Sequence, residues 1–322
     1  MIPIRPGRRI HGISAVLLPF TREVSSGDGL AESIAWAEFE GLLQRTAAAG
    51  IDCAVNMDTG FGPQLSEELR LRVLDLTRGV LGSGGFVAGA FVADRPGADF
   101  DCAAYRRAAD AIVERGGTPI FFPSYGLVSG SDDRIVERFQ SLAEHYDTFL
   151  AFELGEMFAP FGRVFSLEVY ERLLEIPQCV GAKHSSLDRR QEWERLALRD
   201  RKRTDFHVYT GNDLAIDMVM WGSDYLLGLS AFHPEAFAAR DRWWAEDDAR
   251  FFALNDALQY LGAFAFRPPV PAYKHSAAML LKQRGRIHCS ATHPASPTRP
   301  QSDELVLAEI LERIDSAMNA SP

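Results

Sequence analysis

The chain has 322 residues, of which 47% are hydrophobic and 24% charged, and this composition is typical of globular proteins. Its length suits one barrel with an added element, or two modest domains. Its formal net charge of −10 at pH 7 argues against a nucleic-acid partner, because phosphate backbones attract basic surfaces. The four cysteines, Cys53, Cys102, Cys179 and Cys289, form no CxxC motif, which gives no support to a zinc knuckle or a thioredoxin motif and favours reduced thiols in the cytosol.

The first apolar run, residues 13–20, follows Arg8 and Arg9 and in that respect looks like a secretion signal. The run is short, is interrupted by Pro19 and ends in the polar residues 21–23 without a small-residue cleavage site, so we interpret it as a buried first strand. No stretch approaches the ~20 apolar residues that a membrane span requires. We therefore expect a cytoplasmic protein that has no membrane partner.

Short apolar runs alternate along the chain with longer amphipathic ones, and near-continuous apolar runs favour parallel strands that are covered on both faces. The predicted strands are residues 13–18, 51–57, 86–92, 118–122, 148–152, 179–183, 206–209 and 225–229. The predicted helices that follow them are residues 36–49, 66–81, 105–115, 132–146, 167–174, 188–202, 214–221 and 235–242. Eight such units in series predict a (β/α)8 TIM barrel, although a doubly wound sheet alternates in the same way.

The chain continues beyond the eighth unit. Helical patterns cover residues 247–266, 273–283 and 304–318, and a Ser-, Thr- and Pro-rich loop covers residues 288–302. We therefore divide the chain into a barrel, residues 1–240, and a C-terminal helical extension, residues 241–322.

Functional side chains of a TIM barrel lie at the C-terminal ends of its strands, so we expect the reactive groups at the predicted strand ends. Lys183 ends the sixth apolar run, and lysine is rarely buried without a reason. Desolvation lowers the pKa of a lysine and provides the neutral amine that attacks a ketone carbonyl. The alternative is a lysine that reaches the rim or pairs with an acid.

Several segments share an order and spacing with one enzyme family. They are Gly12-Ile13 through Pro19-Phe20-Thr21, Met57-Asp58-Thr59-Gly60-Phe61 with Leu65-Ser66-Glu67-Glu68, Pro123-Ser124-Tyr125, Gly181-Ala182-Lys183-His184-Ser185-Ser186, and Gly211-Asn212-Asp213 with Gly222. Over essentially the whole chain they resemble the dihydrodipicolinate synthase / N-acetylneuraminate lyase family of class I aldolases. The resemblance implies that Lys183 forms a Schiff base with a 2-oxo acid such as pyruvate.

The resemblance also implies roles for other residues. Thr59 would hold the substrate carboxylate together with backbone N–H groups of the turn around Asp58–Gly60, a suitable anion site. The backbone around Leu227 and Gly228 would line the substrate pocket. Tyr125 would reach into the site of a neighbouring subunit, which implies a homodimer or a homotetramer. No organic cofactor is implied, because the protonated imine is itself the electron sink, and the eight histidines show no metal-binding spacing.

Two positions depart from the family pattern. The family places a catalytic tyrosine at the end of the fifth strand, where this chain has Phe152, and a phenyl ring cannot transfer a proton. The first threonine of the strand-two loop, which belongs to a relay with two tyrosines in the family, is replaced by Asp58. Because a positioned carboxylate can act as a general base, we expect Asp58 and Glu153, or Glu156, to take over proton transfer.

Two further residues lie near this site in the sequence. His184 follows Lys183 and points to the opposite side if the strand continues, so we expect it to be structural. Arg163 is the only cation in the loop of residues 156–165, and it is the candidate for binding the carboxylate of a second substrate. The acidic residues nearby favour a second half of the substrate that is neutral or hydroxylated.

The leading hypothesis is a lyase that acts through a Lys183 Schiff base, either on a carbon–carbon bond next to a 2-oxo acid or by eliminating water from a sugar acid. One alternative is a non-catalytic barrel that binds 2-oxo acids, which the missing strand-five tyrosine favours. Another is a hydrolase or dehydratase in which Asp58 and Glu153 act and Lys183 only pairs with them.

Overall fold

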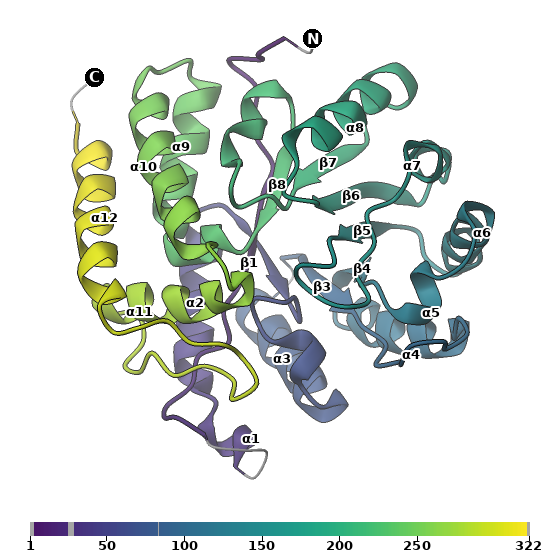
Figure 1. Cartoon of the computed structure of the whole chain (residues 1–322), viewed down its shortest axis with the longest axis horizontal. Helices are drawn as coiled ribbons and strands as arrows, with labels where there is room; N and C mark the ends of the chain where they lie inside the picture. The colour runs from purple at the N-terminus through teal and green to yellow at the C-terminus, as the bar shows by residue number, and fades with distance from the viewer. Residues whose placement is uncertain (1–2, 25–28, 83, 321–322) are drawn as a thin grey trace.

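Eight parallel strands close into a barrel in the order in which they follow along the chain, which confirms the predicted (β/α)8 fold (Figure 1). The computed structural model describes residues 3–24, 29–82 and 84–320. The strands are β1 (Gly12–Ala15), β2 (Asp52–Val55), β3 (Phe86–Ala90), β4 (Gly117–Phe121), β5 (Phe149–Leu154), β6 (Cys179–Ser185), β7 (His207–Thr210) and β8 (Asp224–Leu227). β8 pairs with β1 and so leaves no free sheet edge.

The helices wrap the barrel and then continue beyond it. Those that cover the strands are α2 (Trp36–Ala48), α3 (Glu67–Leu81), α4 (Cys102–Val113), α6 (Asp132–Ala143), α7 (Leu167–Leu174), α8 (Arg189–Lys202) and α9 (Pro234–Ala245). The short ones are α1 (Leu30–Ser33), α5 (Tyr125–Val128) and the 3₁₀ turns η1 (Gly62–Gln64), η2 (Ile216–Trp221), η3 (Leu229–Phe232) and η4 (Val270–Ala272). The C-terminal helices are α10 (Arg250–Ala265), α11 (Tyr273–Gln283) and α12 (Asp303–Met318).

The bounds of most elements shift by a few residues from the prediction, and two of the differences have a clear physical cause. The predicted α-helix at 214–221 is the 3₁₀ helix η2, whose first N–H, on Ile216, donates to the side chain of Gln259 on α10 (2.9 Å). A 3₁₀ helix rises about 2.0 Å per residue against about 1.5 Å for an α-helix, so it spans the short distance back to β8 with fewer residues. Strand β8 ends two residues earlier than predicted, because the Leu229 N–H donates to the Asp213 carboxylate (2.8 Å) and starts η3.

Successive side chains of each strand point to opposite faces of the sheet, so the structure has two apolar cores, one inside the barrel and one between the barrel and its helices. In β5, Phe149 and Ala151 face the helices, whereas Leu150 and Phe152 point into the barrel and join side chains such as Ile120 in an inner apolar cluster. A side chain on the inner face near a strand end is therefore surrounded by other strands and little water.

The C-terminal helices lie together on one side of the barrel (Figure 1). α10 packs on α9 and α12, and α11 packs on α12 and on η3, the turn that follows β8. The start of α11 is thereby brought to the C-terminal end of the barrel. α9, the last helix of the barrel, ends shortly beyond the division that we predicted at residue 240.

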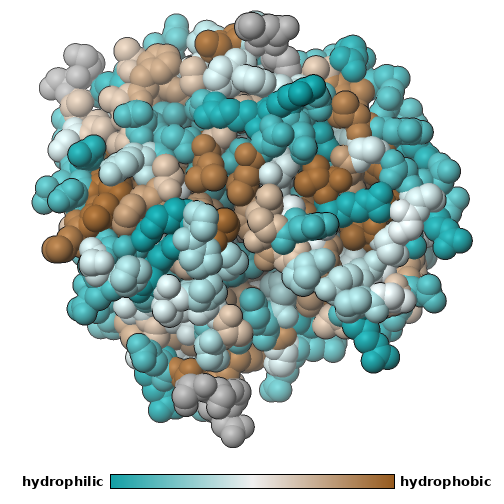
Figure 2. Space-filling view, viewed as in Figure 1, coloured by the Kyte–Doolittle hydropathy of each residue, from teal (hydrophilic) through white to brown (hydrophobic). Residues whose placement is uncertain are grey.

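The surface is mixed in polarity. Figure 2 shows one face, on which polar side chains separate the apolar ones into small groups. In the described part of the chain, no helix combines the length and the apolar character needed to cross a bilayer.

A prediction follows from the contact between β3 and the loop after β2. A Cβ atom on Gly89 would lie 2.4 Å from the carbonyl oxygen of Asn56, a backbone atom at the start of that loop. We expect Gly89→Ala to destabilise the protein by about 1–3 kcal/mol through overpacking. In the control Gly79→Ala, on α3, the added methyl meets nothing within 4 Å, and we expect stabilisation by roughly 0.5–1 kcal/mol. Urea denaturation measures both, and equal stability of the two variants would contradict the prediction.

Candidate active site

Lys183 lies on the inner face of β6 and is almost fully buried. Its neighbours Ala182 and His184 face outward, and the side chain of Lys183 is only 8% exposed. Lys183 pairs in register with Phe152 of β5, and its Nζ lies 4.6 Å from the centroid of the Phe152 ring. Burial lowers the pKa of Lys183 to about 8, although the carboxylates of Asp213 and Asp58 act in the opposite direction. A substantial fraction of the amine is therefore neutral near pH 8, as nucleophilic attack requires.

The segment after β7 is fitted closely around this amine. A Cβ atom on Gly211 would lie 2.8 Å from Cε of Lys183 and 2.1 Å from Oγ of Ser185, so a larger residue here would displace these side chains. Asp213 is buried, and burial raises its pKa to about 7. Its carboxylate accepts the N–H of Leu229 (2.8 Å) and so joins the end of β7 to the turn after β8.

The loop after β2 brings Asp58 and Thr59 to the same end of the barrel. The turn is closed by its own backbone, because the N–H of Gly60 donates to the carbonyl of Met57 (3.1 Å). The N–H of Gly60 is thus engaged within the turn, and the predicted anion site at this turn stays a prediction. Thr59 is buried, and its hydroxyl faces Gly228, where a Cβ atom would lie only 2.9 Å away. Glycine at 228 keeps the space beside this hydroxyl open.

Two residues of α11 complete the cluster, and the sequence analysis missed both. The hydroxyl of Tyr273 donates to Asp58 Oδ2 (2.9 Å) and lies 2.9 Å from Thr59 Oγ1. The ammonium of Lys274, 1% exposed, donates to Asp58 Oδ1 (3.0 Å). Burial, together with the Asp58 carboxylate, raises the pKa of Tyr273 well above its ordinary value. The chain has only four lysines, and this end of the barrel buries two of them.

The comparisons with known proteins agree with this geometry at the level of the fold. The sequence matches no protein-family model and no curated protein. Among solved structures, dihydrodipicolinate synthase from Thermotoga maritima superposes with a TM-score of 0.77 at 16% identity, over 96% of this chain and 99% of that one. The enzyme from Rhodopseudomonas palustris gives a TM-score of 0.76 at 18% identity, over 97% and 100%.

The chain has the fold of the dihydrodipicolinate synthases. The Acinetobacter baumannii enzyme, solved in complex with pyruvate, matches equally well, with a TM-score of 0.75 at 18% identity over 96% of this chain and 99% of that one. The resemblance found in the sequence is thereby confirmed for the fold, including the C-terminal helices, because the matches cover nearly all of both chains.

Glu153 is not brought to Lys183 in this dihydrodipicolinate synthase fold. It follows Phe152 on β5 and therefore points outward, where it is fully buried. Its carboxylate accepts two hydrogen bonds from Arg195 (2.6 and 2.8 Å) and lies 2.8 Å from Nδ1 of His184. Burial alone would raise the pKa of Glu153, but the His184 and Arg195 interactions hold it at about 2. His184 has the structural surroundings that we predicted.

The side chains of Arg163, Tyr125 and Leu227 contact other parts of the fold. Arg163 donates to the carbonyls of Val128 (2.8 Å) and Gly130 (3.0 Å) and pairs with Asp132, so it fastens the loop after β5. Tyr125 begins α5 and sits beside Phe161 of the loop after β5, with ring centroids 6.0 Å apart. The side chain of Leu227 belongs to the outer core, which leaves only its backbone for a ligand. Within the described residues, no cluster of His, Cys, Asp and Glu side chains is arranged to hold a metal ion.

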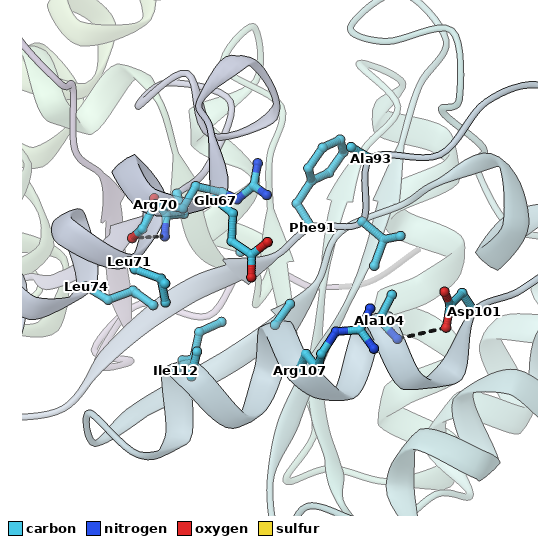
Figure 3. Close-up of a pocket in the computed structure, with 15 residues that line it drawn as sticks. Glu67, Arg70, Leu71, Leu74, Phe91, Ala93, Asp101, Ala104, Arg107 and Ile112 are labelled. Atoms are coloured by element: carbon cyan, nitrogen blue, oxygen red, sulfur yellow. Dashed lines mark hydrogen bonds between the residues drawn. The ribbon is translucent and has the colours of Figure 1, made fainter. Parts of the chain in front are cut away.

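A separate cavity of about 360 Å³ lies outside the barrel between α3 and α4 (Figure 3). Glu67 and Arg107 reach toward it from the two helices. Arg70 is occupied by the carbonyl of Leu65 (2.7 Å), and Asp101 caps α4 by accepting the N–H of Ala104 (2.8 Å). The residues that line this cavity do not include Lys183, Tyr273 or Lys274. We therefore place the candidate active site at the C-terminal end of the barrel and not in this cavity.

The buried ion pair on the outer face of β5 yields the second prediction. We expect Glu153→Gln to cost about 3–5 kcal/mol of unfolding free energy, because Arg195 would keep a buried, uncompensated charge. The matched control is Asp133→Asn on α6, whose partner Arg172 lies 2.6 Å away on an exposed surface, and its cost should be below about 1 kcal/mol. Chemical denaturation of both variants measures the difference, and a Glu153→Gln protein as stable as the control would contradict the structural role.

Proposed function

We propose that this protein is a class I aldolase-type lyase that forms a Schiff base between Lys183 and a 2-oxo acid such as pyruvate. The observation that carries the proposal is the placement of Lys183, a buried lysine with a pKa of about 8 at the C-terminal end of a barrel strand. The fold supports it, because the solved structures that superpose on nearly the whole chain are dihydrodipicolinate synthases.

The reaction proceeds through a carbinolamine to a protonated imine. The neutral amine of Lys183 attacks C2 of the 2-oxo acid, and a proton moves from nitrogen to oxygen to give a carbinolamine. The hydroxyl then leaves as water after taking up a proton, and a protonated imine remains. This cation withdraws electrons from C3, where a proton is lost or a carbon–carbon bond forms or breaks.

The other groups of the site suit an anionic substrate beside Lys183. Thr59 lies beside the space that Gly228 leaves, and its hydroxyl would turn from Tyr273 to donate to a substrate carboxylate there. An apolar ring lies against the amine, that of Phe152 (4.6 Å), and Phe152 in turn packs on Phe122, which contacts Phe161 of the loop after β5. Such surroundings exclude water, which strengthens the electrostatic interactions within the site.

The alternative of a carboxylate-dependent hydrolase is less well supported, because Glu153 is tied to Arg195 and His184 on the other side of the strand. The alternative of a non-catalytic 2-oxo acid binder differs from the proposal in turnover only. We retain the predicted role of Tyr125 in a homo-oligomer as part of the proposal, since Tyr125 stands at the rim of the barrel end beside Phe161.

The third prediction tests the Schiff base directly. Pyruvate and sodium borohydride should add one reduced pyruvyl group to the wild-type protein, and peptide mapping should place it on Lys183, because only this buried lysine lies free of an ion pair with Asp58. Lys183→Ala should show no mass gain. The matched control Lys202→Ala removes an exposed lysine that pairs with Glu171 and should be labelled like the wild type.

Intact-mass spectrometry reports the gain, and larger 2-oxo acids serve as further probes. A wild-type protein that no 2-oxo acid labels would overturn the proposed function. Labelling of Lys274 in place of Lys183 would overturn the assignment of the nucleophile. Labelling of Lys183 followed by no exchange of C3 protons and no reaction with aldehydes would favour the non-catalytic binder.

A further inference from the structure

We propose that the second substrate of the Lys183 site is an aromatic aldehyde, which binds against a set of phenylalanine rings on the inner side of strands β3 to β5. This inference rests on the proposed function and deepens it, because it names the class of electrophile that reacts at C3 of the 2-oxo acid bound to Lys183. It narrows the neutral or hydroxylated second half that the sequence predicts to an apolar one.

The C-terminal end of the barrel has a polar half and an aromatic half. The polar half comes from the loops after β2 and β7 and from α11, and its side chains are Asp58, Thr59, Asp213, Tyr273 and Lys274. The aromatic half comes from β3, β4, β5 and the loop after β5, and its rings are Phe91, Phe122, Phe152 and Phe161. Lys183 lies on β6, between β5 and β7. A 2-oxo acid with its carboxylate beside Thr59 therefore leaves the aromatic half for the group that reacts at C3.

Contacts between rings join the aromatic half to the amine. Nζ of Lys183 lies 4.6 Å from the centroid of the Phe152 ring, and Phe152 meets Phe122 edge to face with centroids 5.0 Å apart. Phe122 meets Phe91 (5.6 Å) and Phe161 (6.3 Å) in the same geometry. Rings in such arrangements attract one another beyond the apolar area that they bury. The ring of a substrate would extend this set.

The rings nearest the solvent belong to the loop after β5. Phe158 and Phe161 are partly buried and pack against the inner apolar cluster, whereas Phe122 and Phe152 are buried beneath them. A molecule that approaches Lys183 from this side of the barrel end therefore meets ring carbons. An aldehyde that carries an aromatic ring gains apolar burial there.

The cations beside these rings are already bound to the protein. Arg163, the only cation of residues 156–165, donates to two backbone carbonyls and pairs with Asp132. Arg70 lies 5.7 Å from the centroid of the Phe91 ring, and it donates to a backbone carbonyl of the loop after β2 (2.7 Å). A second carboxylate on the aldehyde would lose its hydration among rings without gaining a partner, and extra hydroxyl groups would do the same.

The condensation needs no further reagent. The imine at Lys183 loses a proton from C3 and becomes an enamine, whose C3 attacks the carbonyl carbon of the aldehyde. The new carbon–carbon bond places the electrons of the aldehyde double bond on its oxygen, which takes up one proton in exchange for the one lost. Water then hydrolyses the imine and releases Lys183 and a 4-aryl-4-hydroxy-2-oxo acid. The reverse sequence cleaves that acid.

The test compares four aldehydes with saturating pyruvate and the wild-type protein, and mass spectrometry measures the products. Benzaldehyde is the probe, cyclohexanecarbaldehyde has a ring of similar size that is not aromatic, succinic semialdehyde is acidic and glyceraldehyde is hydroxylated. We compare KM values, because the carbonyl groups differ in intrinsic reactivity. Benzaldehyde should have a KM about two- to tenfold below that of cyclohexanecarbaldehyde. Its KM should lie about 30-fold or more below those of the two polar aldehydes.

Variants of one ring locate the binding surface. Phe161→Ala should raise the KM for benzaldehyde about tenfold, and Phe161→Leu should raise it less, because an apolar side chain remains. Both variants should keep the wild-type rate at which pyruvate and borohydride label Lys183. The matched control Phe252→Ala removes a ring that is 56% exposed on α10 and should leave the KM unchanged. Circular dichroism confirms that each variant folds.

The outcomes separate this inference from the proposed function. Labelling of Lys183 by pyruvate and borohydride, with no condensation of benzaldehyde or with a lower KM for a polar aldehyde, would overturn the aromatic substrate and leave the Schiff base intact. Equal KM values for Phe161→Ala and Phe252→Ala would overturn the binding surface. A wild-type protein that no 2-oxo acid labels would overturn the proposed function and this inference with it.

Discussion

The amine of Lys183 has to be held out of water at the mouth of the barrel, and several features of the fold follow from that constraint. An isolated lysine in an apolar interior loses hydration that only nearby opposite charge can replace. Here Asp58 and Asp213 provide that charge from two different strand ends. Each carboxylate is then fixed by its own partner, Asp58 by Lys274 and Asp213 by the backbone of Leu229. The loops after β2, β7 and β8 are positioned together as a result.

The alternation of the strands divides charged groups between two environments. On the outer face of β5 and β6, Glu153, Arg195 and His184 form a closed set in which both carboxylate oxygens of Glu153 are bound. Such a set stabilises one register of the two strands, because a shift by one residue would carry a buried charge into the inner core. On the inner face, Phe152 and Lys183 meet at the same level. The buried ion pair on the outer face and the buried amine on the inner face thus come from adjacent residues of the same two strands.

Much of the fold could be predicted from the sequence, because each strand is a nearly continuous apolar run and its burial follows from composition alone. Lys183 could be found for the same reason, since a lysine stands out at the end of such a run. The start of η2 and the end of β8 could not be predicted, because the side chains of Gln259 and Asp213, which are distant in sequence, determine them. Tyr273 was missed because its position depends on how the C-terminal helices return to the barrel, which periodicity does not encode.

At this end of the barrel a phenol reaches the loop after β2 from the C-terminal helices and not from strand β5. The family that the sequence resembles has a tyrosine at the end of the fifth strand, where this chain has Phe152. Phe152 keeps the apolar contact with Lys183 and gives up the hydroxyl. Tyr273 enters the same region from α11, stacked on Phe266 with ring centroids 4.2 Å apart, and presents its hydroxyl to Thr59 and Asp58. The carboxylate of Asp58 is thereby held by two groups of α11, because the phenol of Tyr273 donates to one of its oxygens and the ammonium of Lys274 to the other.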